Sequence, residues 1–174
     1  MRFDQWLGSL LGQSESEIRR IMSDDTALQF LVAWSLFESK RFPGLNVEIG
    51  KLKEYSERLA EENFASPTVE GIALSFHERY QDKSRRKNLM HQRTSAEFER
   101  ALSAPFDALS TADRLFVVCV VVYRYRNNMF HGNKGIASWL VFKPQIRQCT
   151  QALQVFVAHE ESLRPTMVYE AEVA

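Results

Sequence analysis

The stretch that decides the fold is STADRLFVVCVVVYRYR, residues 110–126. Its centre, Leu115 to Tyr123, is the longest apolar run of the chain and is nine residues long. Taken alone, the valine-rich part from Phe116 to Val122 could form a strand. However, Ser110 and Asp113 form a capping-box-like helix start, and no second strand-like run exists to pair with it. We therefore predict a buried helix.

Helical patterns extend over most of the remaining sequence. Ser14 and Glu17 are spaced as a capping box, and Pro144 suits the first turn of a last helix. Apolar residues recur at helical spacing in residues 26–40, 47–59, 69–80 and 96–102. The polar stretch from Lys83 to Arg93 is either a loop or an exposed helix. These patterns predict an all-α protein, an up-and-down bundle of about five to seven helices.

The helix expected over residues 26–40 is apolar on two faces, which predicts a central, buried position. One face contains Leu28, Leu31, Val32 and Leu36. The other contains Phe30, Ala33, Trp34 and Phe37. We expect one domain over residues 1–163, followed by a mobile acidic tail over residues 164–174.

The composition is that of an ordinary globular protein. The chain has 174 residues, 45% of them apolar, with only seven Gly and five Pro, which excludes collagen-like and broadly disordered chains. The nine-residue apolar run is shorter than the roughly 20 residues of a membrane span. The N-terminus has Asp4 and only a short apolar stretch, so we expect no cleaved signal and a cytoplasmic protein without a membrane partner.

Two cysteines, Cys119 and Cys149, lie in apolar surroundings thirty residues apart. This spacing supports neither a zinc site nor a redox pair, and we expect both thiols in the core. No cluster of carboxylates and histidines predicts a metal site, and no cofactor is expected.

The charge is balanced overall but unevenly distributed. Lys and Arg total 22, and so do Asp and Glu, so nucleic-acid binding by bulk charge is excluded but a local basic site is not. No acidic residue lies between Arg114 and His159. That span contains Arg114, Arg124, Arg126, Lys134, Lys143 and Arg147, and we expect it to attract an anion such as phosphate. A second acid-free stretch, Lys83 to Arg93, is typical of a solvated face, although anion binding is an alternative.

The sequence RNNMFH, residues 126–131, combines an arginine, two amides and a histidine at the end of the apolar helix. On an unbroken helix, Arg126 and His131 would diverge by about 140° around the axis. Asn127, Asn128 and Gly132 tolerate turn conformations. We therefore expect the helix to end near Asn128, so that His131 turns back towards Arg126.

This pair of side chains suits the cleavage of a phosphodiester. A guanidinium binds two phosphate oxygens at once, and an imidazole exchanges a proton near neutral pH. RNA supplies its own nucleophile, the 2′-hydroxyl. In the alternative, structural interpretation, Arg126 caps the carbonyls of its own helix and His131 satisfies a turn. Glu38 near the end of another helix would need a cation, for which Arg124 and Arg126 are both candidates.

The residues from Arg126 to His131 resemble the R-x4–6-H motif of HEPN domains, in which Asn127 suits the position after the arginine. The resemblance implies a helical bundle whose members commonly pair, so that two motifs meet in one cleft. It implies a metal-independent endoribonuclease that leaves a 2′,3′-cyclic phosphate and a 5′-hydroxyl. Toxin–antitoxin or defence roles are common in this family, with a nucleotidyltransferase-like antitoxin as a possible partner. Other members are inactive modules that bind RNA, a nucleotide or a partner protein.

The expected roles follow from this chemistry and from the resemblance. Arg126 binds the phosphate, His131 is the acid or base, and Asn127 orients the imidazole or the phosphate. Since cleavage needs both an acid and a base, a homodimer would place two imidazoles in one site. Further RNA contacts are expected from Arg124, Tyr125, Asn128 and Lys134.

Overall fold

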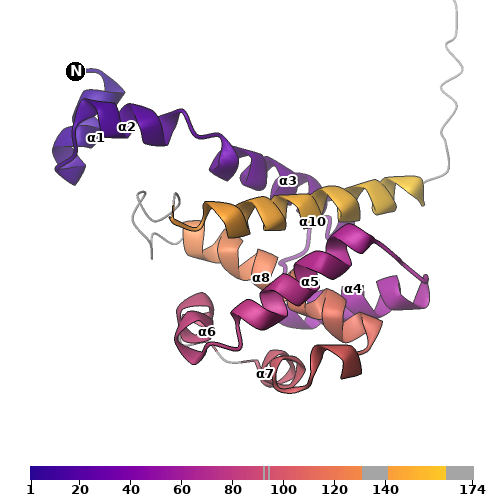
Figure 1. Cartoon of the computed structure of the whole chain (residues 1–174). Helices are drawn as coiled ribbons and strands as arrows, with labels where there is room; N and C mark the ends of the chain where they lie inside the picture. The colour runs from indigo at the N-terminus through magenta and orange to yellow at the C-terminus, as the bar shows by residue number, and fades with distance from the viewer. Residues whose placement is uncertain (92, 94, 131–140, 164–174) are drawn as a thin grey trace, which may run out of the picture.

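The computed structural model describes residues 1–91, 93, 95–130 and 141–163, and within them the chain is helical with no strand (Figure 1). The N-terminal helices are α1 (Phe3–Leu11), α2 (Glu15–Met22), α3 (Thr26–Arg41) and α4 (Ile49–Glu61). They are followed by α5 (Pro67–Arg79), α6 (Lys83–Met90), α7 (Ala96–Ser103), the 3-10 turn η1 (Phe106–Ala108), α8 (Thr111–Phe130) and α10 (Lys143–Ser162). The predicted all-α bundle is confirmed. The acid-free stretch from Lys83 begins as helix α6 rather than as a loop.

Several helices begin at residues whose side chains favour a helix start. Ser14 and Glu17 form the predicted capping box at α2. The Ser110 hydroxyl accepts a hydrogen bond from the Asp113 amide at 3.1 Å, at the start of α8. Pro144 lies in the first turn of α10, as predicted. Each cap satisfies an amide that the helix itself leaves without a partner.

Helix α8 lies at the centre of the main core. Every residue from Leu115 to Val122 is at most 4% exposed, because α4 and α5 pack against it. Because the whole stretch lies within helix α8, the strand alternative is excluded. Cys119 and Cys149 are core residues, as expected, and burial raises the pKa of the Cys119 thiol to about 12. No helix in the described part of the chain combines the length and the apolar character that crossing a membrane requires.

Helices α3 and α10 run in the same direction, side by side (Figure 1). Two ion pairs mark their ends. Asp24, just before α3, pairs with Lys143 at the start of α10. Lys40 pairs with Glu161 at 2.6 Å, near the C-terminal ends of both helices.

Helices α5 and α8 also share a direction. Glu70 pairs with Arg114 near their starts, and the Tyr80 hydroxyl donates to the Tyr125 hydroxyl at 3.2 Å near their ends. Phe142, directly before α10, lines the same pocket as these two tyrosines. One end of the bundle therefore brings together the C-terminal ends of α5 and α8, the start of α10 and helix α6 (Figure 1).

The outer face of α3 differs from expectation. Phe30 and Trp34 are buried, but Leu28, Val32 and Leu36 are 63%, 52% and 46% exposed. The prediction that both faces of this helix are buried is wrong, because α10 covers it from the inner side and no described helix covers the outer side.

The first two helices form a small unit of their own. Leu7, Ile18 and Ile21 make a hydrophobic cluster separate from the main core. Helix α1 packs chiefly on α2, and its Phe3 and Trp6 stay about half exposed. The expected tail, residues 164–174, lies outside the described residues.

Candidate functional site

Helix α8 continues without a break to Phe130, which corrects the expected end near Asn128. The reason is a tertiary contact. The Asn128 side chain is buried, and its amide donates to the Leu89 carbonyl in the last turn of α6 at 3.1 Å. This bond satisfies a carbonyl that α6 leaves free, and it outweighs the turn preference of asparagine. Helix α8 therefore continues through every residue between Arg126 and His131, and the convergence of these two side chains stays a prediction.

The other motif positions lie outside the described residues. These are the expected acid or base His131, the expected turn residue Gly132 and the expected RNA contact Lys134. Their expected roles remain predictions.

Among the described residues, Arg126 contacts Asn127, Glu38 and Trp34. Its Nη1 donates to the Asn127 Oδ1 at 3.0 Å, and its Nη2 lies 4.0 Å from the Glu38 carboxylate. The guanidinium also lies over the Trp34 ring, 5.7 Å from its centre. The indole of Trp34 donates to Glu38 at 2.9 Å and so fixes the carboxylate. Of the two candidate cations for Glu38, Arg126 is thus the one that pairs with it.

The network orients the guanidinium without enclosing it. The Arg126 side chain is still 30% exposed, so an anion can reach it. Asn127, expected to orient the imidazole or the phosphate, contacts the guanidinium itself. Planar, pre-positioned guanidinium groups lose little freedom when they bind a phosphate.

Arg124 is only 5% exposed and forms no salt bridge within the described residues. Its Nε has no hydrogen-bond partner in the described part of the chain, and its guanidinium lies over the Tyr123 ring, 5.7 Å from the ring centre. Burial lowers the pKa of Arg124, and the nearby positive charge of Arg93 lowers it further. A buried cation without an anionic partner is unfavourable, so an incoming anion would stabilise it.

Tyr125 and Asn128 were expected to contact RNA, but each is only 6% exposed. The Tyr125 hydroxyl instead accepts the hydrogen bond from Tyr80. Burial raises the pKa of Tyr80 to about 12 and that of Tyr125 further, so both remain protonated donors at neutral pH. Tyr125 also lines a pocket, which gives a small ligand access to it.

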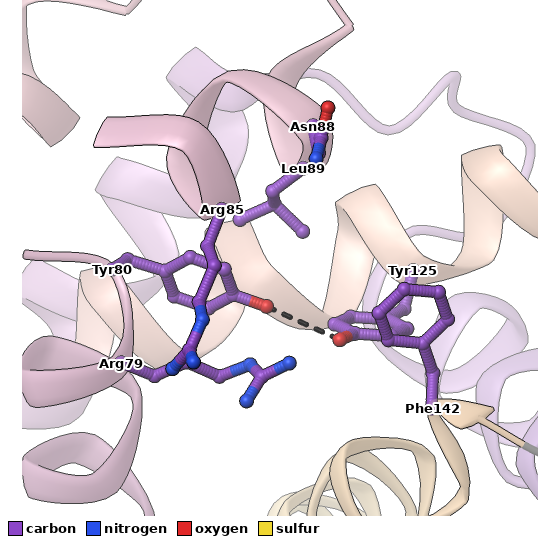
Figure 2. Close-up of a pocket in the computed structure, with 7 residues that line it drawn as sticks. All are labelled: Arg79, Tyr80, Arg85, Asn88, Leu89, Tyr125 and Phe142. Carbon is purple, nitrogen blue, oxygen red and sulfur yellow. Dashed lines mark hydrogen bonds between the residues drawn. The ribbon is translucent and has the colours of Figure 1, made fainter. Parts of the chain in front are cut away.

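The pocket lies between α5, α6, α8 and the start of α10 (Figure 2). Its lining residues are Arg79, Tyr80, Arg85, Asn88, Leu89, Tyr125 and Phe142. Sequence reasoning marked the stretch containing Arg85 as basic and left its role open, and it missed Arg79 and Tyr80. An arginine beside a tyrosine at a helix end is a common pattern, and only the packing of distant helices makes it part of a site.

These observations define a basic end of the bundle, formed by Arg79, Arg85, Arg93 and Arg124. None of the four lies within salt-bridging distance of a carboxylate among the described residues. Uncompensated arginines on neighbouring helices produce a positive local potential even though the whole chain is neutral.

Two further histidines have structural partners. His77 bonds to the Ala104 carbonyl at 3.0 Å, and His159 pairs with Glu62 at 3.0 Å. Over the described ranges, no three His, Cys, Asp or Glu residues lie together as ligands for a metal ion.

Comparison with known proteins adds no relative. No family model matches the chain, and no curated protein or solved structure matches it.

Proposed function

We propose that this chain is a metal-independent endoribonuclease of the HEPN type that binds RNA at the basic end. One observation carries the proposal. The arginine of the motif is held in place at the end of α8, two residues from the buried Arg124, which has no carboxylate partner among the described residues. A polyanion is the ligand that such a group of charges attracts most strongly.

The proposed chemistry is attack by the 2′-hydroxyl on the adjacent phosphate. One His131 takes the proton of the 2′-oxygen, and a second donates a proton to the departing 5′-oxygen. The Arg126 guanidinium binds two phosphate oxygens and stabilises the negative charge of the pentacovalent centre. The products are a 2′,3′-cyclic phosphate and a 5′-hydroxyl, so the reaction needs no added co-reactant.

The two histidines would come from two copies of the chain. The exposed apolar residues of α3, Leu28, Val32 and Leu36, support such a homodimer, because isolated monomers rarely expose connected apolar faces. Helix α3 also carries Trp34 and Glu38, which hold Arg126, so a partner seated there lies near the site. A stable interface needs roughly 800 Å² on each partner, so apolar residues of α1 would have to contribute as well.

The biological setting that fits this activity is a toxin or defence effector in the cytoplasm. Free ribonuclease activity would damage the host cell, so a restraining protein of the nucleotidyltransferase-like antitoxin class is the partner we propose. Coexpression of the chain with and without such a neighbour, with growth as the readout, tests this part separately.

A second candidate function is a catalytically silent module that binds RNA, a nucleotide or a partner protein. The network around Arg126 favours this alternative, since contacts to Glu38, Trp34 and Asn127 are also what a purely structural arginine would make. In that case the basic end binds its ligand without turnover.

Cleavage of structured and unstructured RNAs in the presence of EDTA distinguishes the two functions. We expect cleavage with cyclic-phosphate ends, and a loss of about 100-fold or more in Arg126→Ala. Arg100→Ala on α7, an exposed arginine near the start of α8, is the matched control and should retain activity. Intact RNAs, or a fully active Arg126→Ala, would exclude the nuclease and leave the binding module.

A further inference from the structure

The pocket of Figure 2 has the side chains of an anion site that the R-x4–6-H motif does not include. Arg79 reaches it from the end of α5, and Arg85 reaches it from α6. Neither arginine has a carboxylate at salt-bridging distance in the described part of the chain. Two guanidinium groups directed into one small space repel each other. An anion bound between them would attract both and make the net electrostatic interaction favourable.

Hydrogen-bond donors in the pocket remain unused. The buried Nε of Arg79 has no hydrogen-bond partner within the described ranges. The guanidinium of Arg79 lies over the Tyr80 ring, 6.0 Å from its centre, and the Tyr80 hydroxyl donates to the Tyr125 hydroxyl. The proton of Tyr125 has no acceptor among the described residues. This series of donors ends at the pocket, and each donor polarises the next one towards an acceptor there.

The size and walls of the pocket restrict the ligand. Its free volume is about 50 Å³, whereas pockets for drug-sized ligands reach roughly 300–1,000 Å³. A phosphate group fits this space, but a nucleoside does not. Leu89 and Phe142 supply apolar walls, which strengthen charge interactions inside the pocket.

We infer that this pocket binds the phosphate group of a phosphate monoester. The two positive charges match the dianion of a monoester. A diester within a chain carries only one negative charge, and the chain on its two sides would have to leave the small pocket in different directions. The source of the group is a terminal phosphate of RNA or a free nucleotide. The RNA source rests on the proposed function, whereas phosphate binding itself does not.

Titration with inorganic phosphate tests the site without RNA. Isothermal calorimetry of the full chain, with chloride at equal ionic strength as reference, should show saturable binding to one site. Arg85→Gln and Tyr125→Phe should each weaken binding about tenfold. Arg100→Gln, outside the pocket, should bind like the parent protein. Absence of saturable binding, or equal affinity in Arg85→Gln and the parent, overturns the proposal. Arg85 is exposed, so its variant is expected to fold.

Competition identifies the source of the phosphate. Short RNAs of one sequence with a 5′-phosphate, a 3′-phosphate or two hydroxyl ends are compared with a nucleoside monophosphate. Tighter binding of one phosphorylated RNA end, lost in Arg85→Gln, indicates an RNA-end site. Equal binding of the nucleotide and the phosphorylated RNA indicates a nucleotide site. Cleavage of the hydroxyl-ended RNA is measured in parallel, so a failure of the nuclease and a failure of the pocket are seen separately. If none of the phosphorylated ligands binds better than the hydroxyl-ended RNA, the pocket is not a phosphate site.

Discussion

The two ends of the bundle use positive charge differently. At the end where α4 and α10 finish, which we call the paired end, Arg58 contacts both Glu62 and Glu160, and His159 contacts Glu62. At the basic end, Arg79, Arg85, Arg93 and Arg124 have no carboxylate partners among the described residues. Charge at the paired end is neutralised within the chain, which contributes to stability. The positive charge at the basic end is not neutralised by any described carboxylate, so it can attract an anion from outside the chain.

The largest expected difference between the ends is in RNA affinity. The double variant Arg85→Gln/Arg93→Gln should bind single-stranded RNA about 10- to 100-fold more weakly at low salt. The slope of log affinity against log salt should fall by about 0.7 for each removed contact, because fewer counterions are released. Fluorescence anisotropy between 50 and 200 mM salt measures both quantities.

Arg58→Gln at the paired end is the control for this measurement. Its charge is already matched by Glu62 and Glu160, so its affinity and slope should equal those of the parent protein. Equal losses in the two variants would show that RNA does not distinguish the two ends.

A smaller and opposite difference is expected in stability. Arg58→Ala removes two carboxylate contacts and a cation–π contact with Tyr55, whose ring centre lies 5.2 Å from the guanidinium. Since Arg58 and Glu160 are largely shielded from water, the free energy of unfolding should fall by about 2 kcal/mol. Arg85→Ala should change it by less than about 0.5 kcal/mol. Urea unfolding compares the two, and a similar loss in both would contradict the division into a paired and a basic end.

The smallest expected effect is an acid dependence of the paired end. The hydrogen bond from His159 holds the pKa of Glu62 below its usual value. A carboxylate with a lowered pKa in the folded state stabilises the protein above about pH 4.5, and this contribution is lost as the pH falls through the folded pKa. Glu62→Gln should therefore be less stable than the parent at neutral pH, by at most about 1 kcal/mol, and the difference should shrink below about pH 4. A difference that is constant from pH 7 to pH 3 would rule out this linkage.

Local sequence signals predicted most of the fold. Ser14, Ser110 and Pro144 mark helix starts, because capping depends on neighbouring residues only. The valine-rich stretch was assigned correctly once the cap before it was considered. The exposed outer face of α3 could not be predicted, since a periodic pattern identifies an apolar face but not what covers it.

The candidate site shows the same limit. Asn127 was expected to orient the imidazole or the phosphate, whereas in the structure its Oδ1 accepts a hydrogen bond from Arg126, a contact that the sequence did not predict. The predicted end of α8 was wrong, because the hydrogen bond that extends the helix past Asn128 joins this residue to Leu89, which is far away in sequence. The pocket of Arg79 and Tyr80 was missed for the same reason, as it exists only where α5, α6, α8 and α10 meet.

The central claim is that the motif at the end of α8 cleaves RNA, and two matched histidine variants test it most directly. His131→Ala removes the proposed acid or base, whereas His159→Ala removes the histidine that pairs with Glu62 at the other end of the bundle. Cleavage of one labelled RNA by both purified proteins, each checked for folding by circular dichroism, should be abolished in His131→Ala and retained in His159→Ala. Full cleavage by His131→Ala would contradict the claim.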